Sequence, residues 1–223
     1  MSPAPFATIL DAARLRHGAS AIDARLPQPR SAAELTATPD DRYLSQMSLR
    51  IFRAGLKHSL VDAKWPAFEE VFARFDPRRV WTMSDEAMEK LLGDARLIRH
   101  WGKLKSIRDN AAAMLAVSEE FGGFGAWIGT WPGNNIVGLW EALATRFSQM
   151  GGNSGPTFLR MVGKDTFILS PSVVAGLKQW AEMAPPKNKK DRTVAQAVFN
   201  AWATETGMQL SQLSLILAMS VDG

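Results

Sequence analysis

The chain has 223 residues, of which 46% are hydrophobic and 22% are charged, and its formal net charge at pH 7 is +4. This balance allows one sizeable hydrophobic core, or two small lobes that share one, and excludes wholesale disorder. The absence of cysteine excludes disulfides and thiolate metal sites. With no apolar run near the ~18 residues of a membrane span and no secretory signal pattern, we expect a soluble, cytoplasmic protein.

Apolar residues recur with helical spacing along nearly the whole chain, and glycine and proline separate the helical stretches. Residues 166–169 alone have a β-like character, and they are too few to carry a sheet. Residues 25–40 contain three prolines and are expected to form a loop, whereas Pro66 is expected in the first turn of a helix. The pattern predicts an all-α protein, with helices at about residues 6–17, 40–56, 66–75, 84–93, 102–121, 136–147, 157–162, 172–183, 194–204 and 211–219.

A basic, proline-containing stretch predicts the domain organisation. Residues 185–192 (PPKNKKDR) have the composition of a mobile linker. The helix expected after them is strongly apolar, so it should dock on the body of the protein. We therefore predict one domain over residues 1–184, a linker over 185–192 and a docked helical extension over 193–223.

Residues 150–157 (MGGNSGPT) form the sharpest turn of the chain, between two expected helices. Three glycines within five residues permit positive φ angles and close approach of another backbone. A helix that starts at Pro156 would present free N–H groups and the positive end of its dipole, which together bind phosphate oxygens. A helix–helix corner without a ligand is the alternative. The predicted contacts to nucleic-acid phosphates are Gly151, Gly152, Asn153, Ser154, Gly155 and Thr157.

Residues 150–170 resemble the helix-hairpin-helix segment of the DNA glycosylase superfamily, in which a glycine hairpin and a second helix lead to a catalytic aspartate. The middle of the chain resembles the bacterial 3-methyladenine DNA glycosylase I family more closely. The matches cover about residues 40–170, and the stretches that carry them are Ala54-Gly55-Leu56, Phe75-Asp76-Pro77, the block 91–103 (LLGDARLIRHWGK) and Asn110-Ala111.

The resemblance implies a helix-hairpin-helix glycosylase fold and a monofunctional enzyme of base-excision repair. Such an enzyme hydrolyses the N-glycosidic bond of alkylated purines, 3-methyladenine first among them, in double-stranded DNA. We expect a monomer without a cofactor. The alternative is a non-catalytic protein that binds DNA lesions or DNA structure on the same scaffold.

Several family positions differ in this chain. Aligned from Ala54-Gly55, Arg50 stands at the family's catalytic glutamate and His58 at the tryptophan that stacks on the base, while Ser170 stands at the superfamily's aspartate. The family's zinc site requires two cysteines, so no metal is expected here. Arg50 stays cationic and cannot replace the acid. We expect Arg50 and His58 in the base pocket and Lys103 at a DNA phosphate.

Two routes around the missing carboxylate are open. A 3-methylated adenine is already positively charged and leaves as a neutral base, so positioning and desolvation can lower the barrier without a general acid. In the second route Asp62, one helical turn after His58, forms a rebuilt His–Asp pair that holds a water. The alternative is that His58 and Asp62 are an ordinary pair of surface residues without a catalytic role. Asp165 and Glu141 are weaker candidates, and Ser170 cannot supply the missing negative charge.

Overall fold

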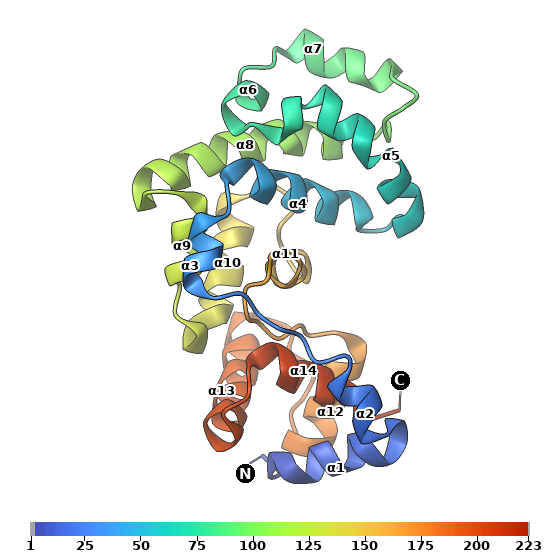
Figure 1. Cartoon of the computed structure of the whole chain (residues 1–223), viewed down its shortest axis with the longest axis vertical. Coiled ribbons are helices and arrows are strands. Elements are labelled where there is room, and N and C mark those ends of the chain that lie inside the picture. Colours follow the sequence, from blue (N-terminus) through green and yellow to red (C-terminus); the bar gives the residue numbers. More distant parts are fainter. Residues whose placement is uncertain (1–2, 223) are drawn as a thin grey trace. The chain divides into compact units, whose positions relative to one another are not determined.

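The computed structural model describes residues 3–222, and every regular element in this range is a helix. The all-α prediction is therefore confirmed (Figure 1). No helix in the described range combines the length and the apolar character that a membrane span requires. The elements are α1 (Phe6–His17), α2 (Ala19–Asp23), α3 (Ala32–Ala37), α4 (Asp40–Arg53), α5 (His58–Val71), η1 (Ala73–Phe75), α6 (Pro77–Trp81), α7 (Asp85–Lys90), η2 (Leu91–Gly93), α8 (Trp101–Phe121), α9 (Phe124–Thr130), η3 (Gly133–Asn135), α10 (Ile136–Arg146), α11 (Ser154–Val162), α12 (Pro171–Ala181), α13 (Lys189–Thr206) and α14 (Leu210–Met219).

The chain divides into two compact units, each assembled from segments that are distant in sequence. Within the described range, unit 1 contains residues 3–30, 132–141 and 163–222, and unit 2 contains residues 31–131 and 142–162. The C-terminal helices belong to the same unit as α1 and α12. This division differs from the expected one of a body over 1–184 with an extension over 193–223, because the contacts that define unit 1 join the two ends of the chain.

Unit 1 is built around α14, which packs against α1, α12 and α13. The rings of Phe167 and Phe199 stack with their centroids 4.2 Å apart, and the Trp202 indole N–H donates to the Ala4 carbonyl at 3.0 Å. The side chains that α14 buries include most of its leucines. The apolar C-terminal helix thus packs within unit 1.

Unit 2 is organised around α8, the longest helix, with α4, α6 and α9 packed against it (Figure 1). The expected helix over 102–121 agrees with α8 to one residue, and Gly122 ends it in the left-handed conformation. Beside α4 lies a cluster of stacked aromatic rings in which Trp65 stacks with Phe68 and with Phe75, at centroid distances of 5.0 and 5.4 Å.

One helix lies inside the expected loop over residues 25–40. The Ser31 hydroxyl accepts from the Glu34 N–H at 3.2 Å, and the Glu34 carboxylate accepts from the Ser31 N–H at 2.8 Å. This reciprocal capping box starts α3. Because α3 has only six residues, its helical spacing is too short to stand out among the surrounding prolines.

Two helix starts and one strand-like stretch differ from expectation. Helix α5 begins at His58, so Pro66 lies in its interior and not in a first turn. Helix α13 begins at Lys189, where a capping box between Asn188 and Asp191 turns half of the expected linker into helix. Residues 166–169 form no strand and connect α11 to α12.

Candidate functional site

The glycine turn that leads from α10 into α11 has an exposed tip, whereas Met150, Gly155 and Pro156 beside the tip are buried. Gly151, Gly152 and Asn153 are exposed, and Gly152 has a φ of +58°. The N–H groups of Ser154 and Gly155 donate back into the turn, to the carbonyls of Gly151 and Met150, both at 3.1 Å. Helix α11 therefore begins at Ser154, two residues earlier than expected.

The first amides of α11 are consequently not the free donors that the sequence suggested. Those of Ser154 and Gly155 are bonded, Pro156 has no N–H, and the Thr157 N–H donates to the Asn153 carbonyl at 3.1 Å. The N–H groups of Gly151 and Gly152 donate to no carbonyl or side chain in the described part of the chain. The donors available to an anion thus lie in the turn itself.

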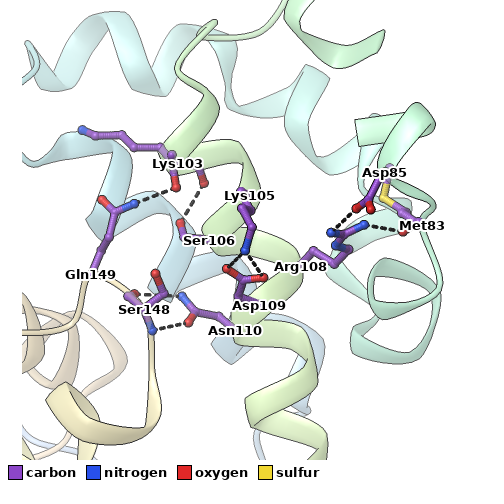
Figure 2. Close-up of polar contacts among 11 residues, drawn as sticks. Met83, Asp85, Lys103, Lys105, Ser106, Arg108, Asp109, Asn110, Ser148 and Gln149 are labelled. Carbon is purple, nitrogen blue, oxygen red and sulfur yellow. Dashed lines mark hydrogen bonds and ion pairs between the residues drawn. The ribbon is translucent and has the colours of Figure 1, made fainter. Parts of the chain in front are cut away.

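Two side chains hold the entry to this hairpin against α8 (Figure 2). The buried Asn110 amide donates to the Ser148 carbonyl at 3.2 Å and accepts from the Ser148 N–H at 2.7 Å. Gln149, with a φ of +61°, donates from Nε2 to the Gly102 carbonyl at 2.8 Å. Asn110 belongs to one of the sequence motifs, but its role in positioning the hairpin depends on a contact 38 residues away that the sequence does not show.

Lys103 is buried and does not project toward solvent as a phosphate contact would. Its Nζ donates to the carbonyls of Phe52 and Ala54, at 3.3 and 2.6 Å, where α4 ends (Figure 2 shows Lys103 at the start of α8). The last carbonyls of a helix lack intrahelical partners, and a cation satisfies them. Burial lowers the pKa of the Lys103 ammonium, and the nearby charge of Arg50 lowers it further.

The two expected base-pocket residues differ in burial. Arg50, in the last turn of α4, is half-buried, and its Nε is buried without a hydrogen-bond partner in the described part of the chain. Desolvation lowers the pKa of its guanidinium. His58, by contrast, is exposed at the first position of α5. Only Arg50 therefore has the partial burial expected of a pocket residue.

Asp62 is engaged by a cation and not by His58. Arg53 donates from Nε and Nη2 to one carboxylate oxygen of Asp62, at 2.9 and 2.7 Å, and both side chains reach solvent. Arg53 lies in the last turn of α4, and its charged guanidinium fork is a strong partner for a carboxylate. The expected His58–Asp62 pair is not formed.

The remaining acid positions have structural partners. The Ser170 hydroxyl accepts from the Val173 N–H at 3.3 Å as the N-cap of α12. The two carboxylate oxygens of Asp165 each accept from an N–H at the start of α14, at 2.9 Å. Glu141 accepts from Arg192 at 2.7 Å. Each group stabilises a helix start or an ion pair within unit 1.

The fold is that of helical DNA glycosylases. A crystal structure of 3-methyladenine DNA glycosylase I has a TM-score of 0.50 and 26% identity, over 62% of this chain and 82% of that one. The Staphylococcus aureus enzyme has a TM-score of 0.52 at 20% identity, over 62% and 80% of the two chains. The 8-oxoguanine glycosylase/lyase of Methanocaldococcus jannaschii, solved with DNA, has a TM-score of 0.51 at 14% identity over 95% and 94%.

Sequence comparison identifies the branch of these proteins. The methyladenine glycosylase family model matches residues 35–149, and the chain belongs to this family. It is 34% identical to DNA-3-methyladenine glycosylase 1 of Escherichia coli (strain K12) over 83 residues, which are 37% of this chain and 44% of that protein. It is 35% identical to the Haemophilus influenzae DNA-3-methyladenine glycosylase over 67 residues, 30% and 36% of the two chains. The chain thus matches less than half the length of these relatives.

Proposed function

We propose that this protein is a monofunctional DNA glycosylase that hydrolyses the N-glycosidic bond of alkylated purines, with 3-methyladenine as the main substrate. The proposal rests on the family match across residues 35–149, which extends from α3 to α10. The two bacterial relatives are named DNA-3-methyladenine glycosylases, which supports 3-methyladenine as the substrate. We propose double-stranded DNA as the partner and a monomer as the active form; the Methanocaldococcus jannaschii protein of similar fold was solved in complex with DNA.

The hairpin supports DNA binding through its backbone. The exposed amides of Gly151 and Gly152 are suited to phosphate oxygens, which position a duplex without reading its sequence. Asn110 and Gln149 fix the entry to the hairpin on α8, so the turn is preorganised before DNA arrives. A base must leave the duplex stack to react, and a fixed grip on the strand holds the geometry in which it does so.

Cleavage in this chain depends on the leaving base more than on a protein carboxylate. The sugar develops oxocarbenium character, which a carboxylate usually stabilises. Here Asp62 is bound by Arg53, and Asp165 is bound by two backbone amides. A 3-methylated adenine carries its positive charge before cleavage and leaves neutral. Positioning and desolvation of the base can therefore lower the barrier without a general acid. After the base has left with the electron pair of the broken bond, one water molecule adds to the sugar cation and gives up a proton to solvent.

Release of free base from methylated DNA tests the proposal. We expect the protein to release 3-methyladenine from alkylated duplex DNA, and we expect Asp62→Ala to keep the single-turnover rate within about threefold, an effect of less than about 1 kcal/mol on the barrier. Chromatography of the released bases measures both. Loss of release in Asp62→Ala would favour the rebuilt site. Tight DNA binding without any release would establish the non-catalytic alternative instead.

A further inference from the structure

Trp101, at the first position of α8, is a large aromatic side chain that the fold leaves partly in water. It is 37% exposed, and within residues 3–222 its ring stacks on no other aromatic ring and its indole N–H has no hydrogen-bond partner. Tryptophan is enriched at interfaces because it offers a wide apolar face together with one polar donor. The tryptophans whose indole N–H groups donate to a protein acceptor include Trp65, Trp140, Trp180 and Trp202.

A hydrogen bond joins the start of α8 to the hairpin before α11. The carbonyl of Gly102, the residue after Trp101, accepts from Gln149 Nε2 at 2.8 Å, and Figure 2 shows Gln149 reaching the start of α8. Gly151, whose N–H is free in the described range, lies two residues after Gln149. The tip of the hairpin is open, because a Cβ at Gly151 or Gly152 would meet no atom within 4 Å beyond its chain neighbours. The backbone that carries the indole is therefore close to the free amides of the hairpin, within unit 2.

The charge around Trp101 favours an anionic partner. Arg99, two residues before it, is exposed and forms no ion pair with any other described residue. The N–H groups of Trp101 and Gly102 also donate to no carbonyl or side chain in the part of the chain that the structure describes. A nucleotide matches this combination, since its phosphate accepts from the donors and its flat base covers the ring. Positive charge beside an exposed aromatic ring is the arrangement by which proteins bind unpaired bases.

We propose that Trp101 stacks on an unpaired nucleobase while the hairpin amides hold a phosphate of the same strand. Extrusion of a purine leaves the opposite base without a partner, and a single strand presents such bases throughout. Both sources offer the same chemistry, a flat base with its phosphate. In a duplex, the contact stabilises the state in which the damaged purine has left the stack. The assignment of the nucleotide to DNA rests on the proposed function.

The affinities of three DNA probes of equal length test the site: an intact duplex, a duplex with one abasic-site analogue and a single strand. We expect Trp101→Ala to lower the affinity for the abasic duplex about tenfold, which lies within the usual contribution of one base stacked on an aromatic ring. The affinity for the intact duplex should change by less than about twofold. Trp101→Phe keeps a flat ring and should retain most of the affinity.

Trp81→Ala is the matched control. Trp81 is 53% exposed at the end of α6, and Figure 2 shows Met83, two residues further on, on the other side of α8 from Gln149. This variant should bind all three probes within about twofold of the unmodified protein. A loss in Trp101→Ala for the abasic duplex alone assigns the base to a gap in a duplex, and a loss for the single strand as well assigns it to any unpaired base. An equal loss for the intact duplex, or no loss for any probe, would overturn the stacking contact.

Fluorine NMR of the unmodified sequence labelled with 5-fluorotryptophan gives a second readout. The resonance that is missing from Trp101→Phe identifies the Trp101 ring. We expect the abasic duplex to shift this resonance through the ring current of the stacked base, and the intact duplex to leave it in place. A resonance that neither probe shifts would refute the proposal even if the protein releases 3-methyladenine. Because neither measurement uses base release, the proposed glycosylase activity fails or holds separately.

Discussion

At the scale of single residues, two positions considered for the chemistry have structural roles in the fold. Ser170 caps α12, and Asp165 holds the start of α14 through the N–H groups of Leu210 and Ser211. The sequence shows that these residues can accept hydrogen bonds, but the partners of Asp165 lie about 45 residues further along the chain. Spacing within one helix likewise placed Asp62 beside His58 and could not reveal that Arg53 competes for it.

The lowered pKa of Lys103 makes stability depend on pH in a defined direction. Between the folded pKa and the ordinary value of 10.5, the unfolded chain binds more protons than the folded one. The free energy of unfolding therefore rises with pH across that window, by at most about 1.4 kcal/mol per pH unit for one proton. Below the folded pKa the full burial cost is present. We expect the free energy of unfolding of Lys103→Met to rise less steeply with pH than that of the unmodified protein.

Urea unfolding at a series of pH values up to 10.5, in chloride buffer, measures this difference. Lys178→Met is the control, because this exposed lysine of α12 reaches water in the folded and the unfolded chain alike. It should follow the unmodified protein. Parallel curves for Lys103→Met and the unmodified protein would show that the ammonium is not desolvated as its position implies.

At the scale of elements, long helices with a clear end were predictable and short or interrupted ones were not. Helix α8 has 21 residues of helical spacing and a glycine stop. Helix α5 continues through Pro66, which lacks the N–H that would bond the Asp62 carbonyl. The rings of Trp65 and Phe68, on either side of this proline, both pack against Phe52 of α4. Such packing overrides the local preference of the proline, and a single sequence does not show it.

The hairpin before α11 gives the prediction that belongs to this scale. Gly152→Glu places a negative charge and a side chain beside the two free amides, so we expect DNA affinity at low salt to fall at least about tenfold, or about 1.4 kcal/mol. Gly207→Glu is a matched control: Gly207 is also exposed, has a φ of +70° and has open space around its Cα. The Gly207→Glu substitution therefore imposes the same backbone strain and the same charge, but in unit 1. A fluorescence anisotropy titration measures both DNA affinities. Equal affinities of the two variants would show that the hairpin is not part of the DNA interface.

At the scale of the whole molecule, the family resemblance and the fold class could be predicted, but the division into units could not. The quoted motifs covered about residues 40–170, and the family model matches 35–149. The helical segments outside the matched range carry no motif that says where they pack. Unit 1 depends on contacts between residues nearly 200 positions apart, such as the hydrogen bond from the Phe6 N–H to Glu205 at 2.8 Å. Hydrophobic periodicity reports which face of a helix is buried and not against which partner.

These end-to-end contacts predict that α1, although outside the family match, is required for the stability of unit 1. Phe6 is 1% exposed and its ring lies 5.6 Å from that of Trp202, whereas Leu15 on the same helix is 90% exposed. Because Phe6→Ala leaves a cavity beside Trp202, we expect it to lower the free energy of unfolding by about 3–5 kcal/mol. Leu15→Ala should change it by less than about 0.5 kcal/mol. Urea denaturation followed by tryptophan fluorescence measures both, and similar small effects in the two variants would mean that the N-terminal helix does not complete this core.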